Sequence, residues 1–351
     1  MIQPKNILIV RTDRIGDIIL SLPVASIIKK HFPDCKVTFL LKEYTKSLVE
    51  NHPNVDNIIL IKEEGNKILL GKNIKEISRY NFDSAIIVSP KFITSLIIFL
   101  SGIKIRIGTG YRWYSFLFNR KVFEHRKYAV KHELEFNIDL LSIFGIKEEI
   151  KPNSAEFNLK PSIESIKYVE KILSSNGISS HKPIIIVHPG SGGSAIDLPL
   201  YKFKELVKLF YEKLNASIII TGRESEKGIC EELKLNENIK NFAGNFNLSQ
   251  LVALINKSSI FISNSTGPIH IAAALGKYII GFYPKILSCS PQRWGPYTNK
   301  RNIFVPEINC SNCTREQCER LNCMNSININ NVFNQVDKIY QDILLNGEFN
   351  V

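Results

Sequence analysis

The sequence contains no apolar stretch long enough to cross a membrane. A spanning helix needs roughly 18 consecutive apolar residues or more, whereas the best candidate is ITSLIIFL at 93–100, which predicts a buried helix instead. The apolar run after Lys5 ends at Arg11, and no small-residue cleavage site follows it. Because this pattern is unlike a signal peptide, we expect a cytoplasmic protein.

Acidic residues are in the minority. The chain has 33 Asp and Glu residues against 45 Lys and Arg residues, so its 351 residues carry a net charge of +12. Such an excess predicts an anionic partner, whether nucleic acid, a membrane surface or a phosphorylated substrate, without choosing among them. The length and the 44% hydrophobic content are those of a globular chain with one large or two medium domains.

Two common nucleotide-binding motifs are missing from the sequence. The P-loop spacing G-x-x-x-x-G-K-[ST] does not occur, which argues against an ATPase or a mononucleotide kinase. No D-x-D motif occurs either, so the sequence does not predict a nucleotide sugar bound through Mg²⁺.

Cysteines are few outside one cluster. Four of the seven lie between 310 and 323, and in a cytoplasmic protein thiols or metal ligands are expected there rather than disulfides. Their C-x2-C-x4-C-x4-C spacing resembles a zinc knuckle, but the segment has no glycine and no aromatic residue to stack on a base. We therefore expect no metal; the alternative is a zinc site at Cys310, Cys313, Cys318 and Cys323.

Strand-like and amphipathic segments alternate along the chain, which predicts βαβ units, parallel sheets and an α/β fold. The pattern restarts near residue 183, so we expect two Rossmann-like, doubly wound halves. Helices are expected near 17–31, 43–51 and 163–176, and at 331–345, where apolar residues recur at helical spacing. The expected strands are 6–10, 36–41, 57–61 and 84–88 in the first half, and 183–188, 216–221, 260–263 and 278–282 in the second.

The stretch IVRTDRIGDIILSLP at 9–23 runs from a strand through Gly16 and Asp17 into a helix. In doubly wound sheets, ligands bind beyond the carboxyl ends of the strands. At such a position Gly16 permits a tight turn or the close approach of a substrate, and the helix N-terminus favours an ionised Asp17, which could act as a general base. Helix capping without any chemistry explains Asp17 equally well. Asp13, between two arginines, is expected to form structural ion pairs.

Two later motifs predict phosphate-binding turns. HPGSGG at 188–193 follows an apolar strand and offers flexible backbone N–H groups, and NSTGPIH at 264–270 leads from another strand into a helix. A plain turn and a helix cap are the alternatives. The segment 111–132 mixes aromatic residues with Arg and Lys, which suits an anionic or sugar ligand; solvated charges with aromatic anchors are its alternative.

The order of these motifs resembles glycosyltransferase family 9, the ADP-heptose:lipopolysaccharide heptosyltransferases, over nearly the whole chain. The matching segments are RTDRIGDIILSLP, RIGTGYRW, HPGSGG, TGRESE, GNFNLSQLVALI, SNSTGPIHIAAALG and the cysteine array. The resemblance implies a GT-B fold in which 1–175 bind the acceptor and 176–330 bind the nucleotide sugar. It also implies that the C-terminal helix, within 331–351, packs back on the N-terminal domain.

The same resemblance implies an inverting, metal-independent transfer of a heptose from an ADP-sugar to a hydroxyl of the lipopolysaccharide core, with Asp17 as the general base. It implies no cofactor other than the donor. The acceptor is expected to contact Gly16, Arg106, Arg112 and Lys131, and the cytoplasmic protein is expected to bind peripherally to the inner face of the inner membrane. Donor contacts are expected at Gly190, Ser191, Gly192, Glu226, Phe246, Ser265, Thr266, Gly267 and His270.

Two positions depart from the family pattern. Ile196 stands where the family usually has a lysine for the donor phosphate, and Ser265 stands where it commonly has an aspartate. Arg223 is a candidate replacement for the missing cation. The alternatives are a transferase or epimerase of the same fold that uses another nucleotide sugar, for O-antigen or capsule, and a nucleic-acid-binding protein with a zinc knuckle.

Overall fold

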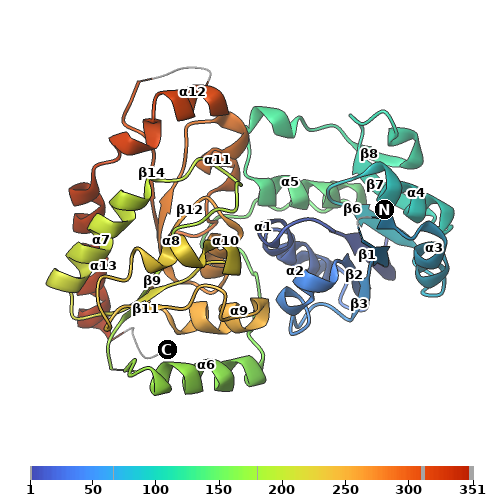
Figure 1. The fold of residues 1–351 in the computed structure, drawn as a ribbon. Coiled ribbons are helices and arrows are strands. Elements are labelled where there is room, and N and C mark those ends of the chain that lie inside the picture. Colours follow the sequence, from blue (N-terminus) through green and yellow to red (C-terminus); the bar gives the residue numbers. More distant parts are fainter. Residues whose placement is uncertain (1, 66, 180, 310–312, 348–351) are drawn as a thin grey trace. The chain divides into compact units, whose positions relative to one another are not determined.

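The computed structural model describes residues 2–65, 67–179, 181–309 and 313–347, and the chain divides into two compact units, Met1–Leu159 and Lys160–Val351. Each unit is built around one six-stranded parallel sheet, as the alternating pattern predicts (Figure 1). None of the helices described is both long and apolar enough to span a membrane.

The first sheet has the strand order β3-β2-β1-β6-β7-β8. The chain therefore moves outward from β1 in one direction and then returns to its other side, which makes the carboxyl end of β1 a topological switch point. The strands are β1 (Asn6–Val10), β2 (Lys36–Leu41), β3 (Asn57–Leu60), β6 (Ser84–Ile87), β7 (Ile105–Thr109) and β8 (Arg120–Val122), and a small hairpin joins β4 (Glu63–Glu64) to β5 (Lys67–Ile68).

The expected helix at 17–31 is two helices, α1 (Ile15–Ile19) and α2 (Leu22–His31). Pro23 lies in the first turn of α2, where its missing N–H and fixed φ suit the start of a new helix and not the interior of a continuous one. The expected helix at 43–51 is a shorter 3₁₀ segment, Glu43–Leu48. The remaining helices of this unit are α3 (Leu70–Ser78), α4 (Phe92–Leu100) and α5 (Glu133–Asp139).

The second sheet repeats the arrangement with the order β11-β10-β9-β12-β13-β14. Its switch point is the carboxyl end of β9, where β9 pairs with both β10 and β12. The strands are β9 (Ile184–His188), β10 (Ser217–Ile220), β11 (Lys240–Asn241), β12 (Ile260–Asn264), β13 (Tyr278–Phe282) and β14 (Arg301–Phe304). The helices are α6 (Ile163–Ser175), α7 (Leu200–Lys213), α8 (Lys227–Glu231), α9 (Leu248–Lys257), α10 (Gly267–Ala274), α11 (Pro291–Trp294), α12 (Arg315–Arg320) and α13 (Ile329–Asn346).

The domain boundary lies earlier than the predicted residue 175. Helix α6 belongs to the second unit because it packs against α9, where the Ser165 and Ser249 hydroxyl oxygens are 2.8 Å apart. The sequence prediction placed α6 at the end of the first domain, since an amphipathic helix carries no signal of which sheet it will cover.

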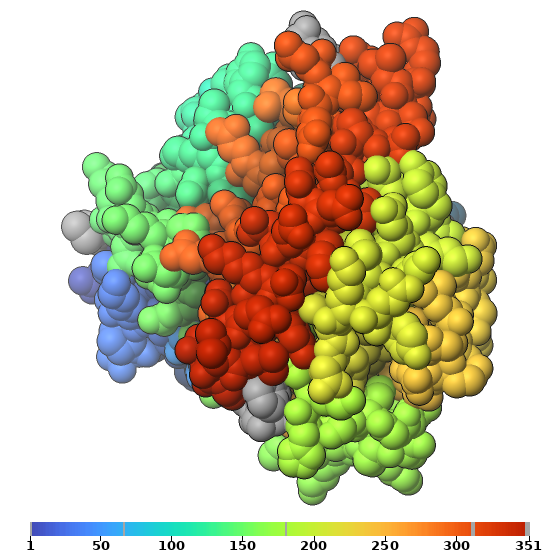
Figure 2. All heavy atoms as spheres, turned by 90° about the vertical axis from the view of Figure 1, so that its left-hand side faces the viewer, coloured from blue at the N-terminus to red at the C-terminus, as the bar shows by residue number. Residues whose placement is uncertain are grey.

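The terminal helix α13 forms as predicted, and its apolar face is buried in the core of the second unit. It packs beside α7, as Figures 1 and 2 both show. Its spacing of apolar residues specified one buried face but could not specify the partner of that face. The side chains it contributes to this core are Ile329, Val332, Phe333, Val336, Ile339, Tyr340 and Ile343.

We predict that Ile343→Ala destabilises the second unit and that Leu345→Ala, two residues further along α13, does not. Ile343 is 1% exposed within the core, whereas Leu345 is 84% exposed. Truncation of a buried isoleucine removes about 2–5 kcal/mol of unfolding free energy, while exposed substitutions usually change it by about 0.5 kcal/mol or less. Thermal unfolding followed by circular dichroism measures the difference, and equal melting temperatures would contradict the packing of α13.

Candidate functional site

Asp17 lies beyond the carboxyl end of β1, at the third residue of α1. One carboxylate oxygen, Oδ2, accepts the backbone N–H of Arg14 at 3.2 Å, which caps the start of the helix. The other oxygen, Oδ1, accepts from Nη2 of Arg11. Capping and a functional carboxylate are therefore compatible here, because the cap uses one oxygen and the side chain remains 18% exposed.

Arg11 is the residue that the sequence interpretation missed at this position. It follows β1 directly, and its side chain is only 1% exposed, so its guanidinium charge must be compensated inside the protein. Three carboxylates do so: Asp17, Asp13 with an Nε to Oδ2 distance of 3.6 Å, and Glu133 with an Nη2 to Oε1 distance of 3.7 Å. Asp13 also pairs with Lys91 at 2.8 Å, so its expected structural role is confirmed.

A second arginine continues this buried network. Nη1 of Arg126 donates to Glu133 at 2.5 Å and to Asn137 at 3.1 Å. Asn137 in turn donates to the carbonyl of Leu20 at 2.9 Å, so α5 is tied to the junction of α1 and α2. No local pattern marks Glu133 or Asn137 in the sequence, because they meet Arg11 and Leu20 only through tertiary packing.

The electrostatics of this network act on Asp17 in both directions. Burial raises the pKa of the Asp17 carboxyl above its usual value, and the charges of Asp13 and Glu133 add to the rise. The Arg11 guanidinium and the N–H of Arg14 oppose it. A carboxylate with a raised pKa is a stronger base than an ordinary aspartate, which is the property that general-base catalysis requires.

In the second unit, the two predicted phosphate turns follow the adjacent strands β9 and β12, so they lie side by side at the same edge of the sheet. Asn264 holds them together. Its side chain donates to the carbonyl of Pro189 at 2.5 Å and accepts from the N–H of Leu198 at 2.8 Å. This buried clamp was not predicted from the sequence, since Asn264 looks there like the last residue of a strand.

The turn after β12 leads into α10 with Thr266 at the N-cap position and Pro268 in the first turn. Thr266 makes no side-chain capping hydrogen bond among the described residues. Plain capping is thus not the use of this hydroxyl, and the first N–H groups of α10 still point toward the turn. Ser265, Thr266 and His270 are all buried, each less than 9% exposed.

The glycine turn after β9 is contacted by two charged side chains that follow β10. A Cβ added to Gly190 would lie 2.1 Å from Oε1 of Glu226, and one added to Gly192, whose φ is +58°, would lie 2.6 Å from Cζ of Arg223. At Gly192 the positive φ favours glycine, and at Gly190 a larger residue would have to displace the Glu226 carboxylate. Glu226 is oriented by the N–H of Arg223, which it accepts at 2.8 Å.

A second cation reaches the same turn from α12. Nη2 of Arg315 donates to the carbonyl of Ala195 at 2.9 Å, and Nε of Arg315 pairs with Glu319 at 3.4 Å. Ile196, which occupies the expected lysine position, packs among apolar side chains and thiols near Cys318 and Cys323. The positive charge at this turn is therefore supplied by Arg223 and Arg315.

Phe246 lies further along the same edge, after β11. Its ring is partly buried and makes edge contacts with Phe242 and Tyr168, at centroid distances of 5.6 and 6.4 Å. His188, at the end of β9, is fully buried, and burial lowers its pKa to about 4, so it is neutral at physiological pH.

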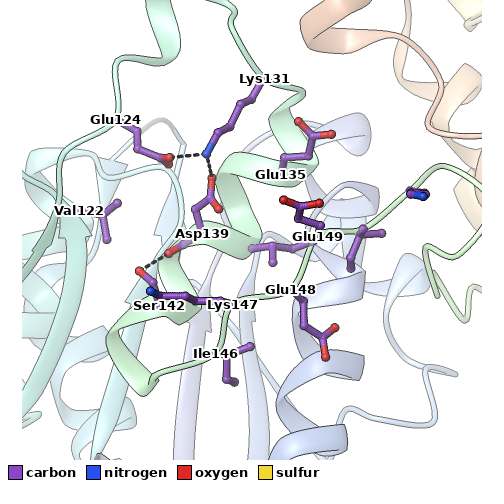
Figure 3. Close-up of a pocket in the computed structure, with 13 residues that line it drawn as sticks. Val122, Glu124, Lys131, Glu135, Asp139, Ser142, Ile146, Lys147, Glu148 and Glu149 are labelled. Carbon is purple, nitrogen blue, oxygen red and sulfur yellow. Dashed lines mark hydrogen bonds and ion pairs between the residues drawn. The ribbon is translucent and has the colours of Figure 1, made fainter.

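Two of the three basic residues predicted to contact an acceptor are already bound within the first unit. Arg106 donates to the carbonyls of Leu117 and Ile103 at 2.8 and 2.6 Å, which is a structural use of its guanidinium. Lys131 reaches between Glu124 and Asp139, as Figure 3 shows, at 2.9 and 2.7 Å.

The cavity beside Lys131, about 820 Å³ in volume, is also lined by carboxylates, including Glu135, Glu148 and Glu149. It therefore does not suit an anionic acceptor. Arg112 remains exposed and makes no ion pair within the described part of the chain.

The cysteine segment forms part of the apolar packing around Ile196, beside the glycine turn after β9. Cys318 and Cys323 are buried, and burial together with the nearby Cys323 and Cys313 raises the pKa of Cys318 to about 12. The six cysteines described are free thiols. No group of three potential ligands arranged for a metal occurs among the described residues, and Cys310 lies outside them.

Comparison with known proteins agrees with the motif order. The sequence model described as glycosyltransferase family 9 (heptosyltransferase) matches residues 70–324. A Haemophilus influenzae protein named putative glycosyltransferase is 31% identical over 313 residues, covering 86% of this chain and 89% of that protein.

Solved structures show the same fold. A family 9 glycosyltransferase from Veillonella parvula superposes with a TM-score of 0.82 at 18% identity, covering 96% of this chain and 97% of that one. The Escherichia coli ADP-heptose lps heptosyltransferase II superposes with a TM-score of 0.77 at 19% identity, covering 96% and 99%. The predicted GT-B fold is thus confirmed.

Proposed function

Because the chain belongs to glycosyltransferase family 9, the heptosyltransferases, we propose that it transfers a heptose or a related sugar from an ADP-sugar to a hydroxyl of a lipopolysaccharide-core acceptor, with inversion. The observation that carries this proposal is the buried pair of Arg11 and Asp17 at the switch point of the first sheet. Membership in the family favours this function over the alternative of a nucleic-acid-binding protein.

In the proposed reaction, Asp17 accepts the proton of the acceptor hydroxyl as its oxygen attacks the anomeric carbon of the donor. The bond from that carbon to the nucleoside diphosphate breaks on the opposite face, which inverts the configuration. Arg11 holds one oxygen of Asp17 and the Arg14 N–H holds the other, so the base is kept in one orientation. Gly16, next to it, is proposed to contact the acceptor.

The departing diphosphate gains negative charge, which the second unit is equipped to stabilise. The candidates are the backbone N–H group of Gly192, the N-terminus of α10 at Gly267, and the cations Arg223 and Arg315, while the N–H of Ser191 donates to the Asp197 carboxylate. These groups supply the charge that the absent D-x-D motif would bring with Mg²⁺, so we propose that the transfer needs no metal. Glu226 and Phe246 are proposed to contact the ribose and the base.

The identity of the donor follows from a relative and not from the turn itself. The E. coli protein of the same fold is named for ADP-heptose, and we propose the same donor here. Ile196 and Ser265 change the usual charges of the turn, so a different nucleotide sugar is the alternative. A nucleotide-release assay with candidate donors and a lipopolysaccharide-core extract distinguishes them: release of ADP supports the proposal, and release of UDP or another nucleotide contradicts it.

The acceptor is proposed to be anionic and to be presented at the cytoplasmic face of the inner membrane. Arg112 is the predicted acceptor residue whose charge is still available, whereas Arg106 and Lys131 are engaged in bonds of their own.

We predict that Asp17→Asn slows sugar transfer by about 10²–10⁴-fold while donor binding is retained. The amide keeps the shape of the side chain but cannot accept the proton, and general-base catalysis contributes an effect of about this size. Asp13→Asn is the matched control, because Asp13 contacts the same arginine but is held by Lys91. Turnover numbers and donor dissociation constants measure both, and near-normal turnover of Asp17→Asn would exclude it as the base.

The pH dependence gives a second test of this base. Asp17 is active when ionised, so transfer falls as the pH drops through its raised pKa. Removing the Arg11 charge with Arg11→Gln raises that pKa further and moves the acidic limb to higher pH. Removing the Glu133 charge with Glu133→Gln lowers it and moves the limb to lower pH.

The measurement is the pH profile of the turnover number for these two variants and for Glu50→Gln, an exposed carboxylate in the same unit that should leave the limb unchanged. Shifts of Arg11→Gln and Glu133→Gln in the same direction would contradict the assignment of the limb to Asp17.

We further predict that Arg223→Ala raises the Michaelis constant for the donor on the order of tenfold, because a charge-assisted hydrogen bond to a phosphate is lost. Lys227→Ala, a few residues away and 59% exposed at its side chain, is the control and should leave the constant unchanged. Equal constants for Arg223→Ala and the unmodified protein would show that the guanidinium does not contact the donor.

A further inference from the structure

Most of the net charge of the protein resides in one segment of the first unit. Residues 91–131 contain nine Lys and Arg residues and a single acidic residue, Glu124, so this segment alone accounts for +8 of the net +12. It comprises α4, β7, the edge strand β8 and the loops that follow them, at one edge of the first sheet (Figure 1).

The same segment exposes large apolar side chains. Trp113 is 74% exposed, and Phe116, Phe123 and Val130 are each more than 60% exposed. Leu100, at the end of α4, and Tyr128 are exposed as well. These apolar side chains lie in the same segment as four exposed cations, Lys104, Arg112, Lys121 and Lys127. We call the surface that they form together the basic aromatic face.

Ring contacts hold these exposed side chains in place. Trp113 stacks on Phe92 of α4 at 5.0 Å, and Tyr111 contacts both Phe123, at 5.6 Å, and His125, at 3.8 Å. His125 contacts Tyr128 in turn, at 5.5 Å. These ring contacts fix the positions of the aromatic side chains. The side chains nevertheless remain largely exposed to solvent.

The α4 end of the face is joined to the same loop. Arg106 lies over the ring of Phe99 at 5.0 Å and donates to the carbonyl of Leu117, next to Phe116. The face is therefore continuous from the end of α4 to the loop.

Several cations of the face are not neutralised internally. Lys104, Arg112, Lys121 and Lys127 take part in no ion pair within the described residues. An edge strand that carries basic residues is protected against pairing with another strand, which accounts for Lys121. It does not account for exposed Trp113, Phe116 and Val130 beside those charges.

We propose that the basic aromatic face binds the surface of an anionic lipid bilayer. Aromatic rings, tryptophan above all, favour the boundary between headgroups and acyl chains, and lysines and arginines beside them are attracted by anionic headgroups. A nucleic acid could bind the cations and stack on the rings, but it has no apolar surface that would bury the aliphatic side chains of Leu100 and Val130. A bilayer accommodates all three kinds of side chain, and for this reason the composition favours lipid.

The proposal rests on the proposed function in one respect, the presentation of the acceptor at a membrane, and assigns the surface that makes the contact. Its test is separate from the transfer reaction, because the vesicles contain neither donor nor acceptor. The probes are vesicles of phosphatidylglycerol mixed with phosphatidylcholine, and vesicles of phosphatidylcholine alone. We expect the full chain to sediment with the anionic vesicles and to be released by high salt. Equal binding to both kinds of vesicle, or binding to neither, would overturn the proposal.

Two pairs of variants locate the binding surface. Trp113→Ala with Phe116→Ala removes apolar groups, and Lys121→Glu with Lys127→Glu reverses charge; each pair should weaken vesicle binding about tenfold or more. The matched controls are Ile163→Ala with Tyr211→Ala and Lys167→Glu with Lys204→Glu, which change exposed residues of the same kinds in the second unit. Circular dichroism checks that each variant is folded, and controls that lose as much binding would overturn the assignment of the face.

Tryptophan fluorescence gives an independent readout. The chain has only two tryptophans, Trp113 and Trp294, so Trp294→Phe leaves Trp113 as the sole reporter. We expect its emission to shift to the blue with anionic vesicles and to be quenched by brominated lipids. Unchanged emission would overturn the proposal, and so would a blue shift that single-stranded RNA causes at a lower concentration than vesicles do. Oligomers of the free protein that Trp113→Ala with Phe116→Ala abolishes would also overturn it, because the face would then bind a second copy of the chain.

Discussion

The candidate base depends on the burial of one arginine. Arg11 emerges from the central strand of the first sheet with its guanidinium almost wholly removed from water, and such a charge is stable only when carboxylates surround it. Asp13, Asp17 and Glu133 fill that need, and Arg126 in turn compensates Glu133. The position and ionisation of Asp17 are thus consequences of a network that spans α1, α5 and the loop before α5. Because each member has more than one partner, removal of one changes the electrostatics of the others.

In the proposed function, the second unit brings hydrogen-bond donors and cations together for an anionic ligand without a metal motif. Two neighbouring parallel strands end at the same sheet edge, and each is followed by one of the two turns predicted to bind phosphate. Asn264 fixes the spacing of these turns, while Arg223 and Arg315 bring charge from segments far apart in the sequence. The loss of the usual lysine at Ile196 is therefore matched by arginines that approach the same turn from other elements.

The charges of the first unit are divided between two surfaces of opposite character. The cavity beside Lys131 is lined by five carboxylates and three lysines, and Lys131 is neutralised by Glu124 and Asp139. The basic aromatic face, by contrast, keeps several cations unpaired beside exposed rings. A net charge counted along the sequence cannot show this division, because ion pairing in the folded state decides which charges remain available to a partner.

The sequence by itself determined the parallel α/β architecture, most of the inner strands, and the positions of Asp17 and of the two glycine and serine turns, because strand periodicity and turn chemistry are local properties. It missed the edge strands β8, β11 and β14, which are short, and the inner strand β7 beside β8. Only the tertiary structure decided that α6 and α13 belong to the second unit, that Arg106 and Lys131 are already bound, and that Arg11, Glu133 and Asn264 organise the candidate sites. Each of these depends on contacts between residues distant in sequence, and local pattern carries no information about which buried faces and charges will meet.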